Sequence, residues 1–119
     1  MHANNAVISS ELQVSGQTIT YTIRVTGILC SAQAWRLREM FQGMQHSATI
    51  LLDLSQVSKM DIQAVQALAI GHKLHRLTVV QPLSAEGGKM LHLTKFTQVL
   101  NLVPSPTATY VDSFSAKIP

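Results

Sequence analysis

The sequence predicts an α/β domain with a mixed sheet, opened by an antiparallel hairpin and covered by helices. Residues 18–25 alternate between polar and apolar side chains, which is typical of a half-buried strand. Residues 48–54 form a short, nearly continuous apolar run, as expected for a strand covered on both faces in a parallel sheet. Residues 34–44 and 62–71 instead carry apolar side chains at helical spacing. Alternation of such helices with strands indicates a mostly parallel sheet.

The hairpin is the first predicted element. A short strand within residues 7–14 is followed by a turn signal at residues 15–17, and the alternating strand comes next. Ile19 and Ile23 are expected to share one face of that strand with the apolar residues between and after them. We expect Gly27 to end the strand.

The first helix is expected to start at Ser31, whose hydroxyl can cap an unpaired backbone N–H group. Its apolar face runs through residues 34–44, and the helix is expected to fade near Gly43. Trp35 and Phe41 are both interpreted as core residues, because large aromatic side chains on a helix are more often buried than used for recognition.

The middle of the chain is expected to alternate strand, loop and helix. After the strand at 48–54, residues 55–59 are predicted to be a connecting loop. Asp61 is a good N-cap for the helix at 62–71, because its carboxylate suits the positive end of the helix dipole. Residues 77–81 then form another buried strand.

The last third is expected to hold a helix, a strand and a terminal helix. The helix lies within residues 84–96 and is weakened by Gly87 and Gly88. A strand at 99–103 is followed by a proline-containing loop at 104–109 and by a short helix over 113–117.

Composition excludes several classes of protein. We expect residues 1–119 to form one domain with a loose N-terminus over residues 1–5. Charged residues make up only 13% and apolar residues 46%, which argues against disorder. The net charge of +3 comes without a basic cluster, so we predict no nucleic-acid partner. No apolar run approaches the roughly 18 residues of a membrane span, and no signal peptide is evident, so a cytoplasmic location is expected.

Four short strings resemble, in order, those of the STAS family (sulfate transporter and anti-sigma factor antagonist). Residues 53–61, DLSQVSKMD, are similar to the D-L-S-x-V-x-x-x-D string of that family. Residues 25–29 resemble its strand ending in G-x-L, residues 91–96 its L-x-L-T-G-L string and residues 112–116 its D-S-x-x-x-A helix. The resemblance spans residues 12–118. It implies a STAS-like α/β domain that binds a protein partner and is not an enzyme.

The resemblance breaks where the family carries its regulatory site. In anti-sigma factor antagonists, a kinase partner phosphorylates a hydroxyl just after the capping Asp, and the phosphate blocks binding. Here Asp61 is followed by I-Q-A-V, and neither Ile62 nor Gln63 can accept a phosphate. We therefore predict no phosphorylation at Gln63 and a constitutive binding module. Modification of Ser55 or Ser58 that abolishes binding would contradict this hypothesis. Lys95, which replaces a helix-ending Gly of the family, is a further departure.

The predicted partner-binding surface lies at the start of the second helix. At about 100° per residue, one helix face mixes amides with apolar side chains and carries no acid. The residues assigned to this surface are Asp61, Ile62, Gln63, Gln66, Ala67 and Ile70. The alternative is that Ile70 and its apolar neighbours simply fill core. A second copy of the chain, forming a homo-oligomer, is left open as another occupant.

Other chemistries have weaker support, and we predict no catalytic residue, no metal and no cofactor. His72 and His75 have a spacing compatible with one metal ion, with His92 as a third ligand, but no acid accompanies them. We interpret His75 as a helix cap and His72 as partly buried. Asp53 is expected to satisfy backbone groups rather than act with Asp61 as an acid–base pair.

Two further features are read as structural. Cys30 has no recognisable partner base, so an ordinary buried thiol is favoured over a reactive one. Gly87 and Gly88 could cradle a phosphate, but no P-loop or G-x-G-x-x-G pattern surrounds them.

We expect the chain to act by protein–protein interaction in bacterial regulation. The resemblance implies an anti-sigma factor antagonist whose phosphorylation switch is lost, with a kinase-like anti-sigma factor as partner. The alternative is an accessory subunit of a phospholipid-trafficking ABC transporter, with the transporter ATPase as partner. A sensor of a small molecule or nucleotide is the third hypothesis.

Overall fold

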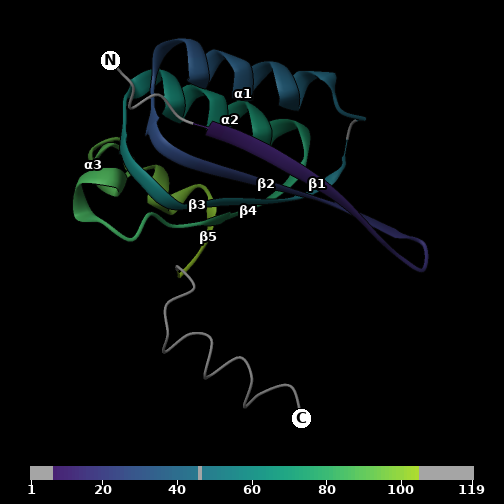
Figure 1. Ribbon diagram of the computed structural model, residues 1–119. Helices are drawn as coiled ribbons and strands as arrows, with labels where there is room; N and C mark the ends of the chain where they lie inside the picture. Colours follow the sequence, from purple (N-terminus) through teal and green to yellow (C-terminus); the bar gives the residue numbers. More distant parts are fainter. Residues whose placement is uncertain (1–6, 46, 105–119) are drawn as a thin grey trace.

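The computed structural model describes residues 7–45 and 47–104, which form one mixed sheet with its helices (Figure 1). The strand order is β1-β2-β3-β4-β5; β1 and β2 are antiparallel, and the other neighbours are parallel. This confirms the predicted α/β fold with its opening hairpin. The elements are β1 (Val7–Ser15), β2 (Thr18–Leu29), α1 (Ser31–Gly43), β3 (Thr49–Met60), α2 (Ile62–Leu74), β4 (Arg76–Val80), α3 (Ala85–Leu93), η1 (Phe96–Gln98) and β5 (Asn101–Val103).

The core lies between the sheet and the helix pair α1 and α2, which run side by side over one face of the sheet (Figure 1). Leu37 and Phe41 of α1 and Leu68 of α2 are fully buried against Ile23 and Leu52 of the central strands. The helical spacing of residues 34, 37 and 41 therefore predicted the buried face of α1 correctly. α3 lies apart from this pair, next to the end of β3 (Figure 1).

β2 does not end at Gly27, as we expected, but continues to Leu29. Gly27 has a φ of 94°, and the pairing of β2 with β3 shifts register next to it. A glycine in this conformation permits a β-bulge, which bends the strand without ending it. The glycine is therefore an irregularity within the strand.

The predicted loop at residues 55–59 is wrong, because these residues form the second half of β3. They pair with the extension of β2: Gln56 lies opposite Thr26, and Met60 lies opposite Leu29. The polar composition of the segment suggested a loop, whereas its alternation of exposed and buried side chains reflects a strand covered on one face.

The start of α1 also differs from the prediction. Its N-cap is Cys30, without a side-chain hydrogen bond, and Ser31 is the first helical residue with a φ of 50°. The Cys30 side chain is partly exposed rather than buried. The first turn of α1 is instead capped by the carboxylate of Asp61, which accepts the backbone N–H of Ser31.

Among the C-terminal elements, α3 lies within residues 84–96 as predicted, and β5 is shorter than the strand expected at 99–103. Lys95 follows α3 with a φ of 62°, in the left-handed region that favours glycine. The predicted terminal helix at 113–117, the terminus at 1–5 and the loop at 104–109 beyond Pro104 lie outside the described residues. Within the part of the chain that the structure describes, every helix is too short or too polar to cross a membrane.

Candidate partner-binding surface

Asp61 fixes the starts of both helices that cover the sheet. Its Oδ1 accepts a hydrogen bond from the backbone N–H of Ala64 at 3.0 Å, which caps α2 as predicted. Its Oδ2 accepts the backbone N–H of Ser31 at 3.3 Å, at the first turn of α1. Both carboxylate oxygens thus hold first-turn backbone N–H groups, and the Asp61 side chain is half-buried.

Of the residues after Asp61 that we assigned to the partner-binding surface, all but one are accessible. Ile62 is 47% exposed, and Gln63 and Gln66 are exposed as well. Ile70 is half-buried. Ala67, which we assigned to the same surface, is only 1% exposed and belongs to the core, because α1 packs alongside α2 and covers that part of the helix. The accessible stripe is therefore narrower than the sequence suggested.

Trp35 is the residue that the sequence interpretation missed. It was expected in the core, yet 55% of it is exposed. Its Arg38 neighbour, one helical turn away, places its guanidinium 5.0 Å from the centre of the indole ring, within the range of a cation–π contact. The helical spacing already indicated that Trp35 is exposed, because the buried face of α1 consists of residues 34, 37 and 41 and Trp35 lies off that face.

Trp35 and Arg38 face the amides of α2 across a groove between the two helices. The groove has a volume of about 150 Å³, and its lining consists of Ala34, Trp35, Arg38, Gln63 and Gln66. It thus joins the stripe predicted on α2 to an aromatic and a cationic side chain of α1. Such a surface can bind another macromolecule by shape, apolar contact and amide hydrogen bonds.

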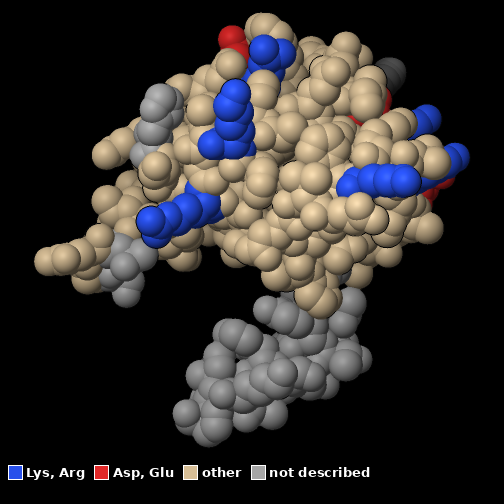
Figure 2. Space-filling model, turned by 180° about the vertical axis from the view of Figure 1, so that it is seen from behind, with Lys and Arg blue, Asp and Glu red and all other residues tan. Residues whose placement is uncertain are grey.

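The charges near this groove are sparse. α1 carries Arg36, Arg38 and Glu39, while α2 carries Lys73 and no acid. On the face that Figure 2 shows, the Lys and Arg side chains stand in ones and twos among uncharged surface rather than in one patch. A clustered basic footprint, as nucleic-acid binding needs, is not visible on that face.

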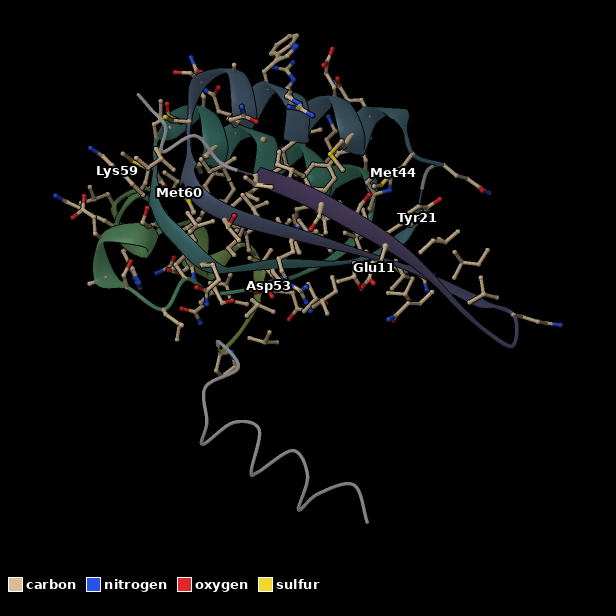
Figure 3. The ribbon with its side chains drawn as sticks, in the orientation of Figure 1. Glu11, Tyr21, Met44, Asp53, Lys59 and Met60 are labelled. Atoms are coloured by element: carbon tan, nitrogen blue, oxygen red, sulfur yellow. The ribbon has the colours of Figure 1, made fainter. Side chains whose placement is uncertain are left out.

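Asp53 has a structural role away from this surface. Its Oδ1 accepts the backbone N–H of Ser55 at 2.9 Å, and its Oδ2 pairs with Arg24 Nε at 3.2 Å. Burial alone would raise the pKa of Asp53, but the hydrogen bonds from Ser55 and the Arg24 guanidinium outweigh it and hold the pKa below its usual range. In Figure 3, Asp53 lies on the side of the sheet away from α1 and α2, and its hydrogen-bond partners differ from those of Asp61.

The histidines have separate environments. His75 is buried; its Nδ1 accepts the N–H of Ala48 at 3.2 Å, and its Nε2 lies 2.6 Å from the carbonyl oxygen of Phe41. Nε2 must therefore carry the proton and donate it. His75 is also the C-cap of α2, as predicted, whereas His72 is exposed rather than partly buried. Among the described residues, no three His, Cys, Asp or Glu side chains come together.

Gly87 serves packing rather than the cradling of a phosphate. A Cβ atom at this position would overlap the carbonyl oxygen of Val57 and would stand 2.9 Å from Pro82 Cβ. Gly88 is different, because its nearest neighbours would be 4.0 Å away. The first glycine therefore lets α3 approach the backbone of β3 closely.

Comparison with known proteins defines the fold. No family model and no curated protein matches the sequence significantly. An anti-sigma factor antagonist from Mycobacterium paratuberculosis superposes with a TM-score of 0.57 at 18% identity, over 92% of this chain and 93% of that one. The unphosphorylated form of the anti-sigma factor antagonist SpoIIAA gives 0.57 at 16% identity, over 91% of this chain and 97% of that one.

A third similar structure is an uncharacterised protein with a SpoIIAA-like fold from Shewanella loihica PV-4. It gives a TM-score of 0.53 at 13% identity, over 94% of this chain and 97% of that one. The protein therefore has an α/β fold that is also found in anti-sigma factor antagonists. More particularly, it has the SpoIIAA-like fold that the STAS resemblance implied.

Proposed function

We propose that this protein is a non-enzymatic regulatory module that binds a kinase-like anti-sigma factor in the bacterial cytoplasm. The binding surface consists of Ile62, Gln63 and Gln66 of α2 together with Trp35 and Arg38 of α1. The likeness of the fold to anti-sigma factor antagonists supports this class of function. Asp61 supports the surface by holding the first turns of both helices.

The observation that carries the proposal is the exposed Trp35 beside the groove. Exposing half of an indole ring to water costs free energy unless a partner covers it, and Trp and Arg dominate the binding energy of many protein interfaces. Trp35 is stacked with Arg38 and faces the amides of Gln63 and Gln66 across the groove. This gives the surface an anchor with polar groups around it.

The proposed binding does not depend on phosphorylation. Gln63, the second residue of α2, is exposed where the family carries a hydroxyl, and an amide cannot be phosphorylated. Ser55 on β3 is 6% exposed, so a kinase has little access to it. Ser58 is exposed and remains the hydroxyl whose modification is worth monitoring.

The test is capture of the partner by the full chain from cells that naturally produce it. Wild type is compared with Trp35→Ala, and Leu93→Ala serves as the control because Leu93 is an apolar α3 residue that is 65% exposed. Wild type and the control should retain one ATP-binding anti-sigma factor, and Trp35→Ala should lose it. Retention of that protein by folded Trp35→Ala contradicts the assigned surface. Capture of a transporter ATPase instead would favour the accessory-subunit alternative.

A further inference from the structure

No strand or helix among residues 7–45 and 47–104 covers the outer edge of β1. β1 pairs with β2 in a regular register over nine residues, and it is the first strand in the order of the described sheet. Val7 and residues 9–14 are exposed. Edge strands are normally blunted by Lys, Pro, a bulge or a covering element, because their free N–H and C=O groups can pair with another strand. β1 has no Lys, Pro or bulge, and Glu11 is its one charged residue.

The same hairpin carries an apolar surface, which we call the hairpin shelf. It consists of the exposed side chains of Leu12, Val14 and Ile19 and the half-buried side chain of Tyr21, which packs against the core. Leu12 pairs with Tyr21 and Val14 with Ile19, so all four side chains share the face of the sheet on which α1 and α2 lie. The hairpin extends beyond these helices, which leaves the shelf uncovered by them (Figure 1). Leu12 is 56%, Val14 65% and Ile19 49% exposed.

We propose that two copies of this chain associate through β1, which pairs antiparallel with β1 of the second copy about a two-fold axis. In the register that we infer, Leu12 lies opposite Leu12 of the second copy. Glu11 then faces Gln13, whose amide can donate a hydrogen bond to the carboxylate. Because the side-chain period of a strand is two, both shelves lie on the same face of the joined sheet and extend each other.

The charge on Glu11 selects this register. Shifting the strands so that Glu11 faces Glu11 opposes two like charges, which is destabilising. The shift in the other direction places Gln13 opposite Gln13 and leaves a shorter overlap, which ends near the turn at Gly16. The Leu12-centred register avoids both problems and overlaps residues 9–15 of each copy.

A second copy fits this edge better than an unlike partner does. In this register the strand is complementary to itself, since its one charged group meets an amide and Leu12 meets Leu12 at the axis, while Val14 lies opposite Ser10. Pairing of residues 9–15 covers part of the exposed surface of Leu12 and Val14, whereas Ile19 lies on β2, one strand in from the joined edge. The interface is therefore small for a specific one, so the dimer should be weak and depend on concentration.

The dimer would leave the proposed partner-binding surface free. The hairpin turn lies at the end of the sheet opposite to the start of α2 (Figure 1). Association through β1 would therefore present two copies of that surface, pointing to bivalent binding. The two proposals are independent, and the failure of one leaves the other standing.

Sedimentation velocity of the full chain from 1 to roughly 500 µM tests the dimer, since weak interfaces of this size associate in about that range. Wild type should shift from monomer to dimer, and Leu12→Lys should stay monomeric. Leu93→Lys, which adds the same charge to an exposed apolar position on α3, should dimerise like wild type. A wild-type chain that is monomeric throughout, or a folded Leu12→Lys that dimerises normally, overturns the proposal.

A charge swap tests the register without changing the shelf. Gln13→Glu places a carboxylate opposite Glu11 and should weaken dimerisation by about two- to thirtyfold, because the two-fold axis creates two pairs of opposed like charges. Adding Glu11→Gln to this variant restores one carboxylate and one amide in each pair, and dimerisation should return. Gln98→Glu, on exposed η1, is the control for added charge. If the double variant fails to recover while remaining folded, the inferred register is wrong.

Discussion

Gly87→Ala adds one methyl group, and its effect on the free energy of unfolding should show whether close packing of α3 against β3 outweighs the better helix propensity of Ala. The Cβ atom of Gly87→Ala would overlap the Val57 carbonyl oxygen and stand 3.0 Å from Ser84 Oγ. The carbonyl belongs to the backbone of β3, so it cannot swing aside as the end of a flexible side chain can. α3 must therefore move away from the sheet. Because Ser84 Oγ accepts the N–H of Gly87 at 2.9 Å, this movement also strains the cap of α3.

The net change in the free energy of unfolding is the sum of opposing contributions. Overpacking costs about 1–3 kcal/mol, and a weakened N-cap costs up to about 1 kcal/mol more. The replacement of Gly by Ala within a helix returns about 1 kcal/mol. Since the obstructing atom is backbone, we expect the upper part of the range and a net loss of about 2 kcal/mol. Gly88→Ala meets no atom closer than 4.0 Å and should stabilise the fold by about 0.5–1 kcal/mol.

Urea unfolding followed by circular dichroism measures both variants on the same scale. The two free energies of unfolding should differ by about 2.5–3 kcal/mol, with Gly87→Ala below and Gly88→Ala above wild type. Equal stabilisation by the two substitutions would show that α3 does not approach β3 as closely as described. Unchanged m-values are needed, because a shift in m would indicate a different extent of unfolding.

Four other changes test the remaining contacts. His75→Ala leaves the N–H of Ala48 and the carbonyl of Phe41 without their buried partner, so urea titration should show a loss of about 2–4 kcal/mol. Lys95→Gly relieves the left-handed backbone at φ 62° and should raise the free energy of unfolding by about 1 kcal/mol. Asp61→Ala removes the α2 cap and should cost about 1–2 kcal/mol in the same assay. The pKa of Asp53 is lowered on folding, so its stabilisation is complete above the unfolded-state pKa and is lost as pH falls through the folded-state pKa. Asp53→Asn should therefore flatten the acid limb of the stability–pH curve, and an unchanged limb would contradict the cause given for the shift.

The features that the sequence predicted correctly are those with local causes. The helical spacing of residues 34, 37 and 41 identified the buried face of α1, and the carboxylate of Asp61 identified the start of α2. The apolar run at 48–54 indicated the central strand, since a strand buried on both faces needs no alternation.

The features that could not be predicted from the sequence depend on contacts between residues far apart along the chain. Residues 55–59 are a strand because the continuation of β2 past Gly27 offers them a partner, and nothing within the segment itself reveals that partner. Ala67 looks accessible on a helical wheel, but the position of α1 buries it. The Arg24–Asp53 pair joins residues 29 positions apart, which no local pattern indicates.

The surface at the start of α2 is tested most directly by the affinity of Gln63→Glu for the captured partner. An acidic residue in the first turn favours a helix by about 0.3–1 kcal/mol, so this variant should be at least as stable as wild type. The added charge should nevertheless weaken binding in isothermal titration calorimetry by roughly 30-fold, the loss typical of an interface hot spot. Gln98→Glu should bind like wild type. Wild-type affinity in a fully folded Gln63→Glu would contradict the central claim that a partner binds at this surface.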